Sequence, residues 1–575
     1  RTLQPGESQT PSFEIPLESV ASYDDSGVTG HKSAWILEQG GYVFYAGADV
    51  RSASEAYSLT LPETVVRQCK SALGPLTAFK RMVNSGGKPE FEDVPLTGEA
   101  FPHDHAKLPA EIPQTGDRGI RLADVVNGKN TLEEFTAQLT DYALFCIIRG
   151  EGMGSPKVTA GTAAAFGGVS DTLTALGIPC ACCDDGPSGM RLDCGTKAFS
   201  LPNGTLLAST FDRSLMTELF TFMGLEMHTN QVDCLLGPGM NIHRHPLNGR
   251  NFEYFSEDPY LTGEMASAEL AGLHSTGAEG TIKHFCGNNR ETRRHFLDSV
   301  ISERALREIY LRGFENAVKK GGAKSVMTTY GQVNGVWTAG NYGLVTGILR
   351  DDWGFDGFTM TDWWANINRR GKAPDKSDFA AMAMAQNDVY MVTADGAACN
   401  DNTLDSLKSG ELTRGELQRN AMNILRFLTT THAMKRVMGC DDETEIINRP
   451  ADAGDVDSTD IEFHDIDEDL TLDLTGITTE KGSSYAFGLN VSKPGVYKVT
   501  LTASSTLSEL AQTSVSIFAL GSPCGMFTFN GTGGAPVSQT KDVKCLSNFM
   551  PIRLYFGGSG LKTQSIRFEL KERWT

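Results

Sequence analysis

Long apolar runs and an excess of positive charge are both missing from this 575-residue sequence. No apolar run approaches the roughly 20 residues that an α-helix needs to cross a bilayer, and we therefore expect no membrane partner. Lys and Arg number 51 against 71 Asp and Glu, which gives a net charge of -20. Because such a field repels phosphate backbones and anionic lipid, we expect no nucleic-acid partner either.

Cysteine is also scarce, with 12 residues at irregular spacing, which excludes a disulfide scaffold. The one dense group consists of Cys180, Cys182, Cys183 and Cys194. It lacks the repeated C-x2-C pair of zinc sites and lies in an apolar run, so we interpret these residues as buried, reduced thiols. The sequence therefore predicts no metal and no cofactor, and the reduced thiols favour a cytoplasmic location.

Residues 1–90 have the pattern of β-structure. Residues 35–37 and 42–45 flank a Gly-Gly turn and predict a hairpin. Further extended pieces bring the count to four or five strands, whereas an immunoglobulin-like sandwich has about seven. We expect an incomplete β-sandwich here, followed by a proline-containing linker at residues 91–120.

Residues 121–445 alternate between short apolar runs and amphipathic helices, the pattern of a parallel α/β fold. A helix is expected over residues 302–320, with Ser302 as its N-cap and Leu306, Ile309 and Phe314 on its apolar face. At this length the alternation predicts a (β/α)8 barrel. A doubly wound sheet is the alternative, but no Gly-rich nucleotide loop opens a helix. The runs expected as strands include residues 143–148, 177–180, 232–236, 325–328 and 357–360.

The composition changes again after residue 445. An acidic linker is expected at residues 446–470, and alternating Thr-, Ser- and Val-rich runs predict a β-sandwich accessory module at residues 471–575. Two roles are open for this module: binding glycan or bracing the barrel. The predicted fold class is therefore α/β plus β, a TIM-type barrel flanked by an incomplete N-terminal β-sandwich and a C-terminal β-sandwich.

Polar residues follow several of the apolar runs. In a (β/α)8 barrel the functional side chains project from the C-terminal ends of the strands, so we expect these residues to converge on one rim. Carboxylates, cations, an imidazole and indoles together suit a sugar ring, which has apolar C–H faces and hydroxyls at its edge. The residues are Asp185, Arg244, Arg250, Lys283, His284, Tyr330, Asp362 and Trp363.

Each of these residues alone has a simpler interpretation. Asp185, before Gly-Pro, has the position of a turn residue, and Asp362 is placed to cap a helix. Lys283 and Arg250 could be solvated rim charges, and Glu253 could be acidic surface. The coincidence of five strand ends favours the functional interpretation.

Longer motifs make a family resemblance specific. Residues 236–244 read Leu-Gly-Pro-Gly-Met-Asn-Ile-His-Arg, and residues 249–259 read Gly-Arg-Asn-Phe-Glu-Tyr-Phe-Ser-Glu-Asp-Pro. With Lys283-His-Phe, Trp353-Gly-Phe-Asp-Gly and Met360-Thr-Asp-Trp, they resemble the barrel domain of glycoside hydrolase family 3, and within it the β-glucosidase branch. The motifs follow the order of the family across residues 121–440.

The resemblance implies a retaining, exo-acting β-glycosidase that removes terminal non-reducing β-linked sugars. It makes Asp362 the nucleophile, whose carboxylate forms a covalent glycosyl-enzyme intermediate. The implied partner is a β-glycoside or an oligosaccharide, with no cofactor. The residues implied to bind this substrate are Asp185, Arg244, Arg250, Lys283, His284, Tyr330 and Trp363.

A retaining mechanism also needs a second carboxyl group as acid and base. In the glucosidase branch this Glu comes from a separate α/β sandwich domain, whose pattern we do not find in the sequence. Residues 3–7 and 35–42 resemble the later strands of the family's fibronectin type III-like domain, which here precedes the barrel, as in members with permuted domain order. We therefore expect the acid/base Glu on a missing N-terminal fragment or on a companion chain.

Two other functions are compatible with the same residues. One is a catalytically silent carbohydrate-binding protein that has kept the pocket, and the other is a glycoside phosphorylase on the same fold. The sequence does not decide the sugar, its linkage or the oligomeric state, and a homo-oligomer is compatible with it.

Overall fold

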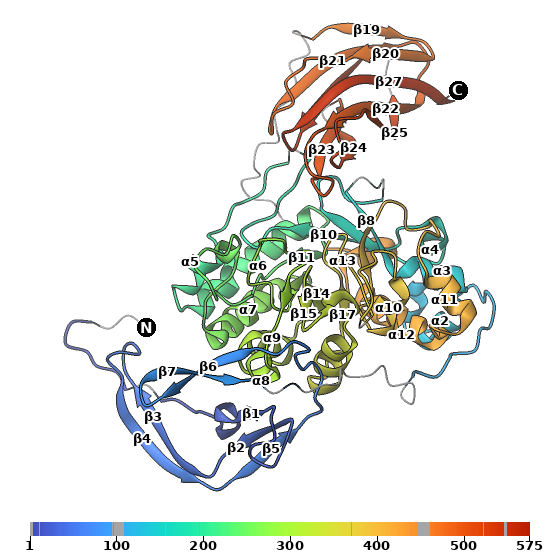
Figure 1. Ribbon diagram of the computed structural model, residues 1–575. Coiled ribbons are helices and arrows are strands. Elements are labelled where there is room, and N and C mark those ends of the chain that lie inside the picture. The colour runs from blue at the N-terminus through green and yellow to red at the C-terminus, as the bar shows by residue number, and fades with distance from the viewer. Residues whose placement is uncertain are drawn as a thin grey trace.

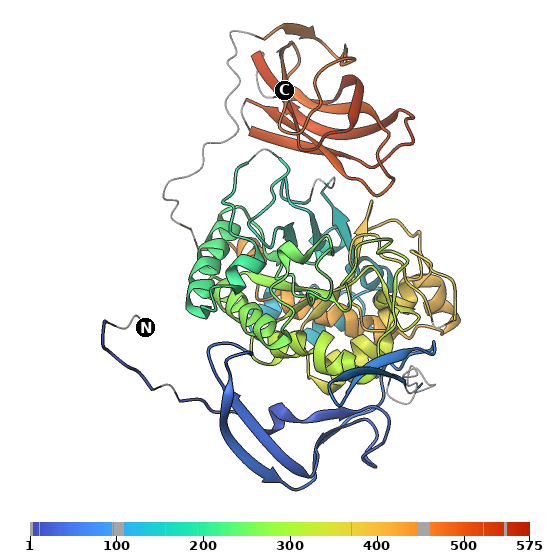
Figure 2. The same cartoon turned by 60° about the vertical axis from the view of Figure 1, so that its left-hand side comes forward.

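The computed structural model describes residues 4–10, 12–94, 96, 108–153, 155, 157–194, 196–369, 371–442, 444, 461–520, 522–545 and 549–574. Within these ranges the chain forms N-terminal strands, a central barrel and C-terminal sheets (Figure 1). The N-terminal strands and the C-terminal sheets lie on opposite sides of the barrel in both views (Figures 1 and 2). The fold is α/β plus β, as the sequence predicts. Residues 97–107 and 446–460, which belong to the two expected linkers, lie outside the described ranges.

The central region is built on an eight-stranded sheet that almost closes on itself. From edge to edge its order is β17-β14-β12-β11-β10-β9-β8-β18, and an isolated bridge between Met360 and Val389 joins the two edges. The strands are β8 (Arg149–Gly152), β9 (Ala164–Gly167), β10 (Cys180–Asp185), β11 (Cys234–Leu236), β12 (Glu279–Phe285), β14 (Ser325–Thr328), β17 (Phe358–Met360) and β18 (Tyr390–Thr393).

One strand departs from the all-parallel barrel that the alternation predicts. β9 is antiparallel to both β8 and β10, whereas the other neighbouring pairs of the sheet are parallel. No helix separates β8 from β9 in the described residues, and a direct return without a crossover forms an antiparallel pair. The (β/α)8 expectation is therefore wrong at this one strand.

Helices surround this sheet, with short strands in its loops. The helical elements are α1 (Leu122–Val126), α2 (Leu132–Ala137), α3 (Asp141–Ile147), α4 (Asp171–Ala175), α5 (Gly204–Ala208), α6 (Arg213–Thr229), η3 (Asn251–Glu253), α7 (Pro259–His274), α8 (Glu303–Ala305), η4 (Leu306–Tyr310), α9 (Arg312–Lys319), η5 (Thr338–Gly340), η6 (Gly343–Asp352), α10 (Phe379–Met384), α11 (Thr403–Ser409), α12 (Arg414–Leu428) and α13 (His432–Met438). The short strands are β13 (Asp298–Ser299), β15 (Gln332–Val333) and β16 (Val336–Trp337). None of the described helices is both long and apolar enough to cross a membrane.

The apolar run at residues 143–148 forms most of helix α3 and not the expected strand. Thr140 caps this helix, and its Oγ1 accepts a hydrogen bond of 3.1 Å from the Ala143 N–H. The run is buried throughout, and periodicity alone cannot distinguish a fully buried strand from a buried helix. The strand, β8, begins directly afterwards at Arg149.

The helix expected over residues 302–320 is present as three consecutive pieces, α8, η4 and α9. Ser302 caps it as predicted, because its Oγ accepts from the Ala305 N–H at 3.2 Å. η4 is a π-helical turn, which changes the phase of the side chains around the axis. Ile309, predicted on the apolar face, is consequently 41% exposed, whereas Phe314 is fully buried.

The N-terminal region forms more strands than predicted, and they pair differently. Residues 35–37 form no hairpin with residues 42–45: β2 lies between β1 and β5, and β3 pairs with β4. β2 is fully buried and has neighbours on both sides, whereas β3 is half exposed. The elements are η1 (Leu17–Val20), β1 (Ser22–Asp24), β2 (Ala34–Leu37), β3 (Gly40–Ala46), β4 (Ser54–Leu61), β5 (Thr64–Gln68), β6 (Lys80–Ser85) and β7 (Lys88–Asp93).

A buried polar cluster joins these strands to the barrel. Glu303 and Arg307 form an ion pair of 3.0 Å. The Tyr23 hydroxyl donates to Glu303 at 3.1 Å, and the Arg307 guanidinium lies 4.8 Å from the centre of the Tyr23 ring. Ser71 donates to the other Glu303 oxygen at 2.7 Å. Because buried charges are stable only when they are paired, this cluster fixes β1 against α8 and η4.

The C-terminal region consists of two sheets that share one core. Their orders are β19-β21-β26-β23-β24 and β20-β27-β22-β25, and the core includes Phe487, Leu501, Ile517 and Phe568. β19 lies wholly and β20 partly inside residues 446–470, the range expected for the acidic linker. Acidic side chains alternate there with apolar ones such as Ile466, which is the pattern of strands. The strands are β19 (Phe463–Ile466), β20 (Asp469–Asp473), β21 (Ser484–Val491), β22 (Gly495–Ser505), β23 (Thr513–Ala519), β24 (Ser522–Phe529), β25 (Val537–Cys545), β26 (Phe549–Phe556) and β27 (Leu561–Arg573).

Candidate active site

A cavity of about 660 Å³ lies at the carboxyl ends of the barrel strands. It contains the predicted site residues Asp185, Arg250, Lys283, His284, Tyr330, Asp362 and Trp363. Asp185 ends β10, Lys283 and His284 lie near the end of β12, and Asp362 follows β17 by two residues. Arg244 is exposed and is not among the residues that line the cavity.

Asp362 is almost completely buried at 6% exposure. Its Oδ1 accepts a hydrogen bond of 2.8 Å from the Trp363 N–H, whereas Oδ2 has no hydrogen-bond partner in the described part of the chain. Burial raises the pKa of this carboxyl above its ordinary value, although the charges of Arg250 and Arg294 and the Trp363 N–H oppose the shift. The site therefore holds a carboxylate with one oxygen available to a ligand.

His284 lies beside this carboxylate in a fixed orientation. Its backbone N–H donates to Asn241 Oδ1 at 2.9 Å, and its ring Nδ1 lies 3.3 Å from both Asn241 Oδ1 and the Tyr254 hydroxyl. Burial, together with the charges of Arg250 and Lys283, holds the pKa of His284 well below its ordinary value. The imidazole is therefore neutral.

Lys283 and Asp185 form an ion pair at the rim. The Lys283 Nζ donates to Asp185 Oδ1 at 2.9 Å, and its side chain is only 3% exposed. Burial would raise the pKa of Asp185, but the charges of Lys283 and Arg250 outweigh it and lower the pKa. The ordinary pKa of an aspartate side chain already lies well below neutrality, so Asp185 remains ionised. The ion pair therefore presents fixed donors and acceptors to a ligand.

Glu253 is a buried partner of Arg250 and not the acidic surface residue that the sequence allows. Its side chain is 5% exposed, and its Oε1 accepts from the Arg250 Nε. Removing either partner would leave a buried charge unpaired, which is costly. Glu253 therefore holds the Arg250 guanidinium in place at the cavity wall.

Arg294 is a cavity residue that was not predicted. Its guanidinium lies 4.5 Å from the centre of the Tyr330 ring, and its Nη1 donates to Glu291 at 2.9 Å. The His295 ring packs against the Tyr330 ring, and the two ring centres lie 4.1 Å apart. Burial, and then the charge of Asp362, raises the pKa of Tyr330 well above its ordinary value. Tyr330 is thus a neutral phenol facing the carboxylate.

The C-terminal sheets also contribute to the cavity. Leu510, Ala511 and Gln512, in the loop between β22 and β23, line it together with Trp364 of the barrel. These residues follow the barrel by many positions and carry no local motif, so nothing in the sequence pattern could have indicated them. Ser514 Oγ donates to the Asp193 carbonyl oxygen at 3.3 Å and attaches the loop to the rim.

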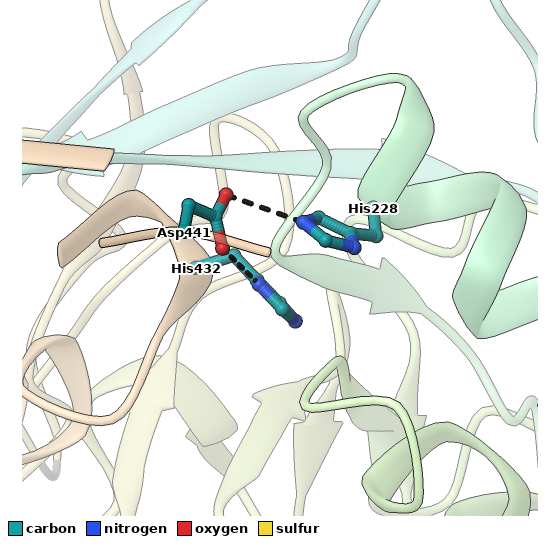
Figure 3. Close-up of side chains that lie close together, drawn as sticks. All are labelled: His228, His432 and Asp441. Carbon is teal, nitrogen blue, oxygen red and sulfur yellow. Dashed lines mark hydrogen bonds and ion pairs between the residues drawn. The ribbon is translucent and has the colours of Figure 1, made fainter. Parts of the chain in front are cut away.

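Outside the cavity, one group of described side chains could reach a single cation: His228, His432 and Asp441 (Figure 3). Both imidazoles already contact Asp441, with His432 Nδ1 at 2.6 Å and His228 Nε2 at 3.2 Å. Their other ring nitrogens contact the Thr276 carbonyl oxygen at 2.7 Å and the Thr444 hydroxyl at 2.6 Å. Because all four nitrogens have partners, we interpret the cluster as a structural link between α6 and α13.

The cysteines form no cluster of ligands either. None of the 12 forms a disulfide, and of the dense group Cys182, Cys183 and Cys194 are buried, as expected, while Cys180 is half-buried.

The fold and the cavity together define a barrel protein with a buried carboxylate surrounded by cations, hydroxyl groups and indoles, an arrangement suited to a hydroxyl-rich ligand. The comparison with protein families agrees with this class. The chain belongs to glycosyl hydrolase family 3: the model of that family's N terminal domain matches residues 117–427.

Curated relatives and solved structures are similar over most of the chain. A β-glucosidase of Ruminococcus albus is 59% identical over 100% of this chain and 62% of its own length. β-Glucosidase A of Butyrivibrio fibrisolvens is 35% identical over 76% of this chain and 53% of its own. The crystal structure of a β-glucosidase from Paenibacillus barengoltzii superposes with a TM-score of 0.73 at 43% identity, covering 96% of this chain and 61% of that one. The chain thus spans less than two thirds of the length of each.

Proposed function

We propose that the protein is a retaining, exo-acting β-glycosidase of the β-glucosidase type that hydrolyses terminal non-reducing β-linked sugars. The observation that carries this proposal is the Asp362 carboxylate, whose Oδ2 has no partner among the described residues and which lies in a polar cavity at the barrel rim. The names of the similar proteins, β-glucosidases of three bacteria, support it.

In the proposed mechanism Asp362 Oδ2 attacks the anomeric carbon and forms a glycosyl ester as the glycosidic bond breaks and the leaving oxygen takes a proton from the acid/base Glu. Water then gives a proton to that Glu and its oxygen to the anomeric carbon, which releases the sugar and the Asp362 carboxylate. Lys283 and Asp185 are placed to bond the hydroxyls of the terminal sugar, and Arg250 lies beside them with its position fixed by Glu253. Trp363 offers an apolar wall for the C–H face of the ring. Arg244 stays a candidate for substrate binding only if it moves, because its side chain is exposed outside the cavity lining.

The acid/base Glu is proposed to come from an N-terminal α/β domain or a partner chain. Each of the other carboxylates that line the cavity is already paired: Asp185 with Lys283, Glu253 with Arg250, and Asp193 with Arg191. A general acid must carry a proton and present it to the leaving group. Burial raises the pKa of Asp193, but both of its carboxylate oxygens accept from the Arg191 guanidinium, at 3.3 and 3.1 Å. The three carboxylates are therefore engaged by cations, which favours an acid/base Glu from elsewhere.

The N-terminal strands support a further domain at this end of the protein. We propose that they belong to a fibronectin type III-like domain. Tyr45, Tyr57, Met82 and Phe91 on β3, β4, β6 and β7 are each more than half exposed. Met82 and Phe91 are cross-strand partners on one hairpin, and exposed apolar side chains favour a covering surface supplied by other polypeptide. The free cysteines support the proposed cytoplasmic location.

The decisive experiment is covalent trapping with a 2-deoxy-2-fluoro-β-glucoside that carries an activated leaving group. Mass spectrometry of peptides should locate the adduct on Asp362, and Asp362→Ala should not be labelled. Glu257→Gln, which alters an exposed carboxylate outside the cavity, is the matched control and should label normally. An adduct on any other residue would overturn the proposal.

An activated aryl β-glucoside separates the proposal from the two alternatives. Its leaving group needs little protonation, so the chain without its acid should still release a burst of product. Substrates with poor leaving groups need the acid, and their cleavage should be about 10²–10⁴-fold slower than with the acid present. A silent carbohydrate-binding protein would release none. A phosphorylase would release sugar phosphate, and its rate would depend on added phosphate.

A further inference from the structure

A second cavity of about 500 Å³ opens between the barrel rim and the C-terminal sheets. Gly152, Trp364 and Thr393 line it from the barrel, and Gln512, Asn530 and Lys541 line it from the sheets. Trp364 and Gln512 also line the first cavity, so the two cavities are adjacent and share part of their walls. The second cavity therefore lies next to the opening through which a longer ligand would extend from the first.

We propose that the second cavity binds the leaving-group sugars of a β-linked oligosaccharide whose terminal sugar occupies the first cavity. This inference rests on the proposed function, because it assigns the first cavity to the terminal sugar. It gives the C-terminal sheets a part in substrate binding in addition to bracing the barrel.

The polar groups of the second cavity are available to a ligand. The Lys541 ammonium and the Gln512 side-chain amide form no hydrogen bond or ion pair with the described residues. Burial lowers the pKa of Lys541, with the charge of Glu151 on the barrel opposing the shift. A partly buried ammonium without a partner is unfavourable, and an apolar ligand would not improve its environment, whereas sugar hydroxyls accept hydrogen bonds from it.

The aromatic side of the cavity is held in place by the barrel. Trp364 adopts a φ of 54°, a strained conformation for a bulky residue, which persists only where the surroundings require it. The backbone N–H of Trp364 donates to the Met391 carbonyl oxygen at 2.8 Å. A half-buried indole opposite unpaired donors is the combination that stacks on a sugar ring and bonds its edge.

The two walls come from different parts of the chain and approach each other closely at Gly152 and Gln512. A Cβ added at Gly152, at the end of β8, would lie 3.9 Å from the Gln512 Nε2 atom. Gln512 therefore lies directly over the barrel rim, where the first cavity passes into the second. We expect it to contact the first leaving-group sugar and Lys541 to contact the next.

The test compares the binding of glucose and of cellotriose by calorimetry in an Asp362→Asn background, which prevents turnover. The Asp362→Asn protein with no further substitution should bind cellotriose more tightly than glucose. Lys541→Met should lower the ratio of the two affinities about tenfold, the loss of roughly one hydrogen bond to a charged group. Gln512→Ala should lower it as well, which keeps the test valid should one variant fail to fold.

Lys544→Met is the matched control, since Lys544 is an exposed residue of the same strand, β25, outside the cavity. It should leave the affinity ratio unchanged. If glucose binds but cellotriose gains nothing over it, or if Lys541→Met and Lys544→Met behave alike, the assignment of the second cavity is wrong while the proposed function stands. If neither sugar binds, the proposed function fails and this inference fails with it.

Discussion

The Nε2 atom of His284 lies 3.8 Å from Oδ2 of Asp362, beyond the reach of a hydrogen bond. Because burial and nearby cations keep the pKa of His284 well below its ordinary value, the imidazole is neutral and does not balance the negative charge. Arg250, Arg294 and Lys283 provide the balancing charge. The oxygen that faces His284 therefore stays open to a substrate, and the three cations oppose the effect of burial on the pKa of its carboxyl group.

Asp362→Asn is expected to stabilise the fold at neutral pH while it abolishes covalent labelling. Burial raises the pKa of Asp362 in the folded protein, so the folded state binds the proton more tightly than the unfolded state and the ionised group lowers stability. We expect a gain of about 0.5–2 kcal/mol, typical of relieving the cost of a functional site. Thermal unfolding at pH 7 measures it.

The gain should shrink as the pH falls, because Asp362 of the unaltered protein then becomes protonated in both states. Glu257→Gln is the control and should leave the melting temperature unchanged. A lower melting temperature for Asp362→Asn at pH 7 would contradict the sign of the pKa shift.

The rate of covalent labelling should fall in acid. In the proposed mechanism only the ionised Asp362 attacks the sugar, and the pKa of Asp362 is raised by burial against the opposing cations. We therefore expect the midpoint of the decline to lie above 3.8, the ordinary value for this side chain. Labelling rates measured between pH 3 and pH 8 locate the midpoint. A midpoint at or below the ordinary pKa of aspartate would show that the nearby cations, and not burial, determine the pKa of Asp362.

Arg294→Gln should move that midpoint to higher pH. The Arg294 guanidinium is one of the charges that lower the pKa of Asp362 against the effect of burial, and glutamine keeps a polar side chain without the charge. The ring contact of 4.5 Å to Tyr330 is altered as well, so Arg294→Lys, which keeps the charge but loses the planar guanidinium, is the comparison. A midpoint that moves equally in both variants would indicate loss of packing and not loss of charge.

Asp441→Asn should destabilise the barrel at neutral pH. Burial raises the pKa of Asp441, but bonds from His432 and His228 outweigh it, and the net shift is downward. The ionised group therefore adds stability above the pKa of the unfolded chain, and this contribution is lost as the pH falls through the lower folded value. We expect a loss of about 1–3 kcal/mol at pH 7, visible as a lower melting temperature that approaches that of the unaltered protein in acid.

Asp442→Asn is the control for that experiment, because the Asp442 side chain is 84% exposed. Addition or removal of divalent cations should change neither variant, since both imidazoles already bond Asp441 and their outer nitrogens are satisfied. A melting temperature that rises with zinc only in the unaltered protein would instead identify the cluster as a metal site.

The rim residues were predictable because their chemistry follows apolar runs directly. Asp185, Lys283 and Asp362 each stand at or just beyond the end of a buried strand, and a parallel barrel brings such positions together. Arg294 was not predictable in this way, since it lies in a loop between β12 and β13 with no strand end to mark it. Gln512 was beyond prediction because it reaches the site through the packing of two distant regions.

The errors in the fold have equally local causes. Residues 143–148 are apolar without period, and the helix signal lay just outside them in Thr140. β9 has the composition of a barrel strand, and only the absence of a helix before it could indicate its reversed direction. β3 pairs with β4 through residues 47–53, a longer connection than the Gly-Gly turn on which the predicted hairpin was based.

The barrel closes at the segment that carries Asp362. The single bridge between Met360 and Val389 forms the join, and the Thr361 and Trp364 N–H groups bond across it to the carbonyl oxygens of Val389 and Met391, at 3.0 and 2.8 Å. Deuterium uptake at these two amides would consequently report local opening of the barrel seam at the segment that positions the Asp362 carboxylate. Opening of the barrel wall at this place would therefore also disturb the geometry that the proposed bond cleavage requires.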